Sequence, residues 1–166
     1  LHGHKGLTTL QKKDIKIKNN TVIFEFIGKD GIPQKVQKTF EDFYVTILKD
    51  LLNKKREEDF VFTDSKGKPL HSEVFTRILH KYTKKHFYPH IIRSYHADTK
   101  CKNFLQKRKS ATNEEVNKRF DNIAKDLGHK KYNKKKGKWE VSRKITIDSY
   151  IRPKYVEEME SLYKKK

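Results

Sequence analysis

The period of the apolar residues changes partway along the chain, and this change limits the fold more strongly than any other feature. Over residues 14–27 apolar side chains alternate with polar ones, which is the pattern of half-buried β-strands. The pair Asn19-Asn20 predicts a tight turn between two strands, and residues 32–38 can return as a third. One face of this sheet is expected to carry Val22, Phe24 and Phe26. The sequence therefore predicts a small antiparallel sheet with Lys29 at the tip of its second hairpin.

Beyond this sheet the apolar residues recur at helical spacing. Thr39, with Asp42 three residues later, predicts the start of a first helix. Its expected buried stripe consists of Phe43, Tyr44, Ile47, Leu48, Leu51 and Leu52. Ser72 and Pro89 predict the starts of a second and a third helix.

The last third of the chain carries further helix signals. Thr112 and Glu115 form a capping box that predicts a fourth helix, which Gly128 would end. Residues 141–152 predict a fifth helix ended by Pro153, and the tail that follows predicts a sixth.

The order of these elements predicts the fold class. Strands come first and helices follow, whereas a wound parallel sheet would alternate them, so the sequence predicts an α+β fold. We expect one domain over residues 1–166, with the sheet at 14–38 and a helical part at 39–166.

The charge balance indicates a polyanionic partner. Lys and Arg number 40 against 21 Asp and Glu, a formal net charge of +19. Such an excess repels itself unless a polyanion compensates it, so nucleic acid is the first expectation and an anionic membrane surface the second. The single Cys101 excludes an internal disulfide and a CxxC zinc site, and it suits a reducing intracellular compartment.

Several residues could act on a phosphate, although each has a simpler explanation. His90 and Arg93 lie one helical turn apart on the same face, and a guanidinium fork matches two phosphate oxygens. The simpler alternatives are a solvated turn lysine for Lys29, a helix C-cap for His129 and a core tyrosine for Tyr150.

A lysine-rich tract separates His129 from Tyr150. Its candidate phosphate-binding residues are Lys130, Lys131, Lys134, Lys135, Lys136, Lys138, Arg143 and Lys144. Each phosphate contact would make DNA binding depend on salt through counterion release. The tract could instead be a disordered solvated loop. The role of Trp139 within it also stays open: it anchors the loop, or it touches sugar and base edges.

The order of these features resembles the catalytic domain of type IB DNA topoisomerases, especially the small poxvirus-like enzymes of large DNA viruses and their bacterial relatives. It is also similar to the wider superfamily shared with tyrosine recombinases. The resemblance covers nearly the whole chain from Gly6. It is carried by Gly6-Leu7-Thr8-Thr9-Leu10, Phe26-Ile27-Gly28-Lys29-Asp30, Ile92-Arg93-Ser94-Tyr95, Leu127-Gly128-His129 and Ser149-Tyr150-Ile151-Arg152-Pro153.

The resemblance implies a role for each candidate residue. Tyr150 would attack a phosphodiester of duplex DNA, leaving a 3′-phosphotyrosine and a 5′-hydroxyl, so that religation needs no ATP. Arg93 and His129 would donate hydrogen bonds to the nonbridging oxygens. Lys29 would protonate the leaving 5′ oxygen from the minor groove, with His90 in a supporting role. The resemblance implies no metal or other cofactor, and a protein that acts as a monomer on DNA.

The chain departs from the family pattern in two places. The family carries a further catalytic Arg just before the Gly6 motif, where this chain has only His2, His4 and Lys5. We expect a C-terminal part of a longer enzyme with an N-terminal clamp domain; the alternative is an enzyme that lacks this Arg and cleaves poorly. The separation of His129 from Tyr150 is also longer than usual, and the lysine-rich insertion accounts for it.

Two other functions fit the same residues. A tyrosine recombinase or integrase would use identical chemistry on two duplexes, and a noncatalytic basic module would bind DNA without cleaving it. All three readings place the protein inside the cell with DNA.

Overall fold

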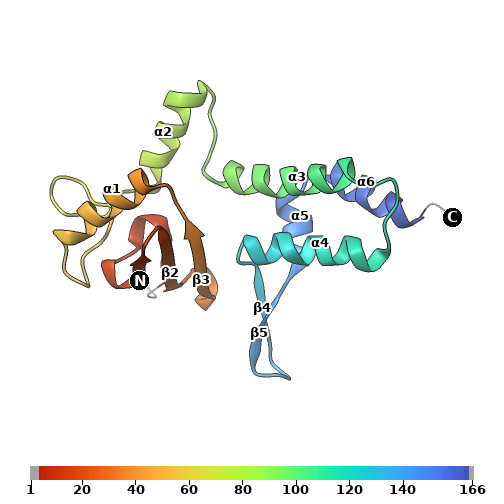
Figure 1. Cartoon of the computed structure of the whole chain (residues 1–166), viewed down its shortest axis with the longest axis horizontal. Helices are drawn as coiled ribbons and strands as arrows, with labels where there is room; N and C mark the ends of the chain where they lie inside the picture. Colours follow the sequence, from red (N-terminus) through yellow and green to blue (C-terminus); the bar gives the residue numbers. More distant parts are fainter. Residues whose placement is uncertain (1–3, 165–166) are drawn as a thin grey trace. The chain divides into compact units, whose positions relative to one another are not determined.

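The computed structural model describes residues 4–164 and divides the chain into two compact units, residues 1–78 and 79–166. The boundary falls inside helix α2 (Ser72–Thr83). A three-stranded antiparallel sheet comes first and six α-helices follow among the described residues, which confirms the predicted α+β class (Figure 1). None of the helices in the described part of the chain is long and apolar enough to cross a membrane.

The sheet of the first unit matches the prediction from sequence. Its strands β1 (Ile15–Lys18), β2 (Thr21–Ile27) and β3 (Pro33–Thr39) pair in that order. The turn between β1 and β2 places Asn19 at φ 51°, a left-handed conformation that asparagine tolerates. Three short 3-10 turns complete this region: Leu7–Thr9, Lys12–Asp14 and Lys29–Gly31. The hydrophobic core cluster of the unit consists of Leu10, Ile15, Val22, Leu52 and Val61.

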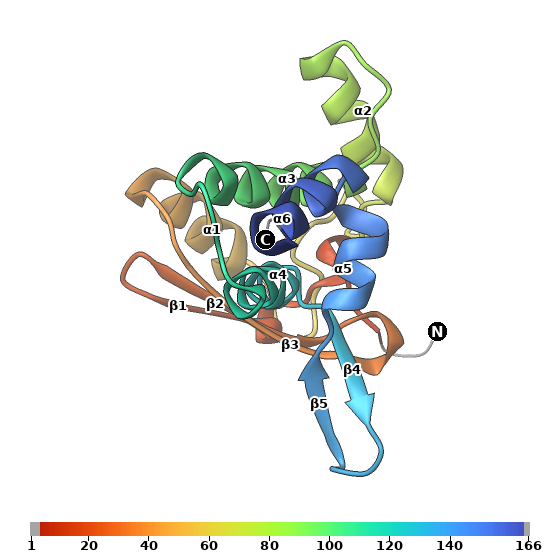
Figure 2. The same ribbon diagram turned by 90° about the vertical axis from the view of Figure 1, so that its right-hand side faces the viewer.

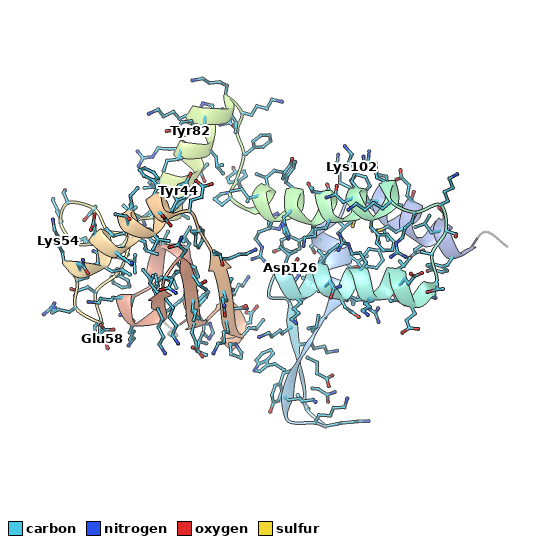
Figure 3. The ribbon with its side chains drawn as sticks, in the orientation of Figure 1. Tyr44, Lys54, Glu58, Tyr82, Lys102 and Asp126 are labelled. Atoms are coloured by element: carbon cyan, nitrogen blue, oxygen red, sulfur yellow. The ribbon has the colours of Figure 1, made fainter. Side chains whose placement is uncertain are left out.

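Helix α1 (Asp42–Asn53) corrects two predictions. It begins at Asp42 and not at Thr39, because Thr39 still pairs with Thr21 as the last residue of β3. The predicted stripe is also too wide: Phe43, Tyr44 and Ile47 are 67, 57 and 51% exposed. The six predicted residues cover more of the helix circumference than one small sheet can bury. Figure 3 labels Tyr44 on this helix.

The second unit is built around the helices α3 (His90–Gln106), α4 (Asn113–Asp126), α5 (Arg143–Tyr150) and α6 (Pro153–Lys164). Their common core consists of Ala97, Cys101, Val116, Phe120, Ile123, Leu127, Ile151 and Met159. The predicted Thr112 and Glu115 capping box is present, since each side chain accepts a hydrogen bond from the other's backbone N–H. The predicted fifth helix is shorter than expected, and Pro153 begins α6.

A two-stranded hairpin in the second unit was not predicted. Strands β4 (Lys130–Asn133) and β5 (Lys138–Val141) pair with Tyr132 opposite Trp139. Residues 39–166 are therefore not wholly helical, and the alternative of a disordered lysine-rich loop is wrong. The two aromatic rings pack edge to face at 5.4 Å between centroids, and such cross-strand pairs stabilise a ribbon. Figures 1 and 2 show the hairpin projecting away from the helices of its own unit.

Candidate active site

The ring of Tyr150 contacts the rings of two histidines in the second unit. Tyr150 is the last residue of α5, and its ring stacks on that of His90 with 4.3 Å between centroids. The ring of His129 is tilted by 50° relative to the Tyr150 ring, with 4.5 Å between centroids. The guanidinium carbon of Arg93 lies 5.1 Å from the Tyr150 ring centroid, within the range of a cation–π contact. Four of the five predicted catalytic residues are therefore brought together.

Arg93 and His129 are joined directly. Nη2 of Arg93 donates to Nε2 of His129 at 2.9 Å and to the carbonyl oxygen of Leu127 at 2.8 Å. A guanidinium only donates, so Nε2 of His129 must accept. Arg93 and His90 share one face of α3, as predicted, because they are three residues apart.

A helix-ending motif positions His129. Gly128 has φ +69°, which glycine adopts without the strain a side chain would add. The backbone N–H of Gly128 donates to the carbonyl of Lys125, and that of His129 to the carbonyl of Ala124. These two bonds form a Schellman motif, which fixes the direction in which the chain leaves α4. The C-cap of α4 is Leu127, two residues before His129, and the His129 side chain bonds Arg93 and Thr146 and not the end of the helix, so the helix C-cap interpretation of His129 is wrong.

The other ring nitrogen of His129 contacts a residue that sequence reasoning missed. Nδ1 of His129 lies 2.7 Å from Oγ1 of Thr146, whose side chain is fully buried. Because Nε2 accepts from Arg93, Nδ1 carries the proton and donates to the hydroxyl. Thr146 precedes Tyr150 by four residues on α5, and this spacing was the only signal in the sequence.

The environment keeps His129 neutral. Burial, the charge of Arg93 and the neighbouring His90 together lower the pKa of His129 to about 4, and burial is the largest of the three causes. The imidazole therefore carries no charge at neutral pH.

A second missed residue anchors the segment after the tyrosine. The buried carboxylate of Asp98 accepts a hydrogen bond from the backbone N–H of Arg152 at 3.0 Å and from its Nε at 2.6 Å. Because this pair spans 54 positions in the chain, no local pattern could reveal it. The double contact holds the turn between α5 and α6, directly after Tyr150.

Lys29 belongs to the first unit and lies in its β2–β3 turn, as predicted. Its side chain is exposed, and the turn depends on Asp30 and Gly31 with φ of 62° and 74°. The N–H of Lys5 donates to the carbonyl of Ile27 at 2.7 Å, so Lys5 lies beside the end of β2. The Lys5 ammonium is held by Asp14 at 2.7 Å. His2 lies outside the described residues.

The predicted phosphate-binding residues fall into two groups. Lys131, Lys134, Lys135 and Lys138 are exposed on the hairpin, as is Lys136, which pairs with Glu140 at 3.1 Å. Lys130, at the base of β4, is half-buried. On α5, Arg143 pairs with Asp121 at 3.5 Å and Lys144 with Asp148 at 3.2 Å, so both cations there are partly neutralised.

Comparison with known proteins identifies the family. No curated protein matches the chain at a significant level. Among residues 4–164, no three His, Cys, Asp or Glu side chains are grouped as metal ligands would be. The family described as eukaryotic DNA topoisomerase I, catalytic core, matches residues 1–162, nearly the whole chain. The chain therefore belongs to the topoisomerase I catalytic-core family, the type IB DNA topoisomerases.

Proposed function

We propose that this chain cleaves one strand of duplex DNA with Tyr150 and reseals it, relaxing supercoils without ATP or metal. The observation that carries the proposal is the contact of the Tyr150 ring with both His90 and His129, with Arg93 bonded to His129. A phenol held beside a guanidinium and two imidazoles suits attack on a phosphodiester, because charge develops on the phosphate next to hydrogen-bond donors. The bond to Tyr150 conserves the energy of the broken linkage.

Arg93 and His129 would stabilise the pentavalent transition state. The Arg93 guanidinium turns its donors from Leu127 and His129 to the nonbridging oxygens. Nε2 of His129 then donates as well, provided that its proton moves from Nδ1. The Thr146 hydroxyl supports both tautomers, since it can accept from Nδ1–H or donate to a bare Nδ1. His90 supports the phenol ring by stacking.

Lys29 would act as general acid towards the leaving 5′ oxygen. An exposed ammonium on a hairpin tip can reach into a groove of a bound duplex, which supports this role. The exposed hairpin lysines would contact phosphates. The protein would act as a monomer on DNA. The narrower likeness to poxvirus-like enzymes rests on the sequence motifs.

The test is an SDS-resistant adduct assay on a nicked suicide duplex, in EDTA and without ATP. We expect the chain to form a covalent adduct, and Tyr150→Phe to form none while binding the duplex with unchanged affinity. A version extended upstream to supply an Arg before Gly6 is assayed in parallel, and an adduct only there would show that this Arg is required.

Other outcomes favour the other functions. An adduct without plasmid relaxation, together with tetramers on DNA, would favour a tyrosine recombinase. Salt-sensitive binding without an adduct from either version would leave a noncatalytic DNA-binding module.

A further inference from the structure

The hairpin of residues 130–141, here called the basic ribbon, is built into the site at its base. Strand β4 begins directly after His129, and β5 leads through Ser142 into α5, which carries Tyr150. The N–H of Ser142 donates to the carbonyl oxygen of His129 at 2.9 Å and closes the base. The tip projects away from the helices of the unit (Figures 1 and 2). A ligand bound along the ribbon would therefore lie next to the Tyr150 site.

The two faces of the ribbon have different chemistry. Residues opposite one another on paired strands share a face. One face combines the Tyr132–Trp139 pair with Lys130 and Val141, and Tyr132 and Val141 are 46 and 42% exposed. The other face carries Lys131, Asn133, Lys138 and Glu140. The ribbon thus presents a partly exposed aromatic face to solvent.

The charge of the ribbon is almost entirely positive. Residues 130–138 contain six lysines, and the single nearby acid, Glu140, is engaged by Asn133 at 2.9 Å and by Lys136 at 3.1 Å. Lys134 and Lys135 are exposed at the tip, where Gly137 with φ +61° allows the tight turn. An isolated two-stranded ribbon is only marginally stable in water, so this one suits a partner that adds contacts. Polyanionic phosphate compensates the lysines, and base edges suit the aromatic face.

We propose that the basic ribbon enters the major groove of the duplex beside the phosphodiester that Tyr150 attacks. The major groove, about 12 Å wide, admits a two-stranded ribbon, whereas the minor groove, about 6 Å wide, has to be widened by deforming the duplex before a ribbon can enter. Lys134, Lys135 and Lys138 contact the phosphates that border the groove, and Tyr132 and Trp139 contact base edges within it. This inference rests on the proposed function for the position of the ribbon relative to the cleaved bond.

The test compares two triple variants in a Tyr150→Phe background, so that binding is measured without chemistry. The ribbon variant is Lys134→Gln, Lys135→Gln and Lys138→Gln. Its control is Lys102→Gln, Lys109→Gln and Lys118→Gln, which removes the same charge from exposed positions on or beside α3 and α4 of the same unit. Figure 3 labels Lys102 on α3. We expect the slope of log affinity against log salt to become shallower by about 2 to 3 in the ribbon variant and by less than about 1 in the control.

Dimethyl sulfate footprinting identifies the groove, because it methylates guanine N7 in the major groove and adenine N3 in the minor groove. We expect the parent protein to protect N7 of guanines next to the cleavage site, and the ribbon variant and Trp139→Ala to lose that protection. Equal salt slopes for the two triple variants, or unchanged N7 protection in the ribbon variant, would overturn the inference. Adduct formation by the chain with Tyr150 intact tests the proposed function separately. A failure of the ribbon inference can therefore be distinguished from a failure of the proposed function.

Discussion

Arg93 donates a hydrogen bond to Nε2 of His129 across 2.9 Å, linking α3 to the segment that follows α4. The bond occupies the nitrogen that would face a phosphate. Without DNA, each of the two side chains therefore has the other as its hydrogen-bond partner. Because Arg93 can donate to a phosphate instead, the pair can open without leaving a buried group unsatisfied.

The stability of the second unit should fall on mild acidification because of His129. Its pKa of about 4 in the folded protein lies below the ordinary 6.5. As pH falls from about 6.5 towards 4, the unfolded chain binds a proton that the folded chain does not, so stability is highest above this window and is lost through it. Over the whole window, the free energy of unfolding falls by about 3 kcal/mol because of His129.

The measurement is urea unfolding at pH 7 and pH 4.5, followed by the fluorescence of Trp139, the only tryptophan, which lies in the second unit. His129→Gln is the matched variant because its amide does not titrate. Between pH 7 and pH 4.5 both proteins lose free energy of unfolding, and we expect this loss to be smaller in the variant by about 2 to 3 kcal/mol. Parallel losses in both proteins would show that His129 is not held neutral.

Thr146 should act as a positioning residue for His129. Thr146→Val keeps the shape of the side chain but leaves Nδ1 of His129 without its partner at 2.7 Å, which costs about 1 to 3 kcal/mol. If this cost appears in the transition state, single-turnover cleavage slows by about 10- to 100-fold. Thr146→Ser retains the hydroxyl and should restore most of the rate. Equal rates for the valine and serine variants would contradict the role.

Asp98 should stabilise the turn after Tyr150. Asp98→Ala removes two charge-assisted contacts with Arg152, and we expect the free energy of unfolding of the second unit to fall by about 2 kcal/mol. Asp98→Asn should lose less, because its side-chain oxygen can still accept from the backbone N–H of Arg152. Trp139 fluorescence in urea gives both values, and an alanine variant as stable as the parent would refute the anchoring role.

Gly128→Ala should disturb both stability and the site. At φ +69° a Cβ costs about 1 to 2 kcal/mol, and the strain falls on the motif that orients His129. Gly6→Ala is the control, because Gly6 has φ −134° and a Cβ there meets no atom within 4 Å. We expect slower adduct formation and a lower urea midpoint only for Gly128→Ala.

Local patterns predicted the elements that local interactions stabilise. The alternation around Val22, the Asn19-Asn20 turn and the Thr112–Glu115 capping box each act within a few residues, and the structure has the strands and the helix that they predict. The basic ribbon escaped prediction because lysine-rich strands have low intrinsic propensity. Its cross-strand pair, Tyr132 with Trp139, becomes visible only once the register is known.

The sequence by itself determined the α+β order, the helix that Gly128 ends and the shared helical face of His90 and Arg93. Only the tertiary structure decided that the Tyr150 ring contacts both His90 and His129, that Thr146 holds His129, and that Asp98 anchors Arg152. The physical reason is range. Hydrogen bonding and side-chain periodicity along one helix are set by neighbours three or four residues away, whereas these contacts join separate elements that meet only when the common core packs.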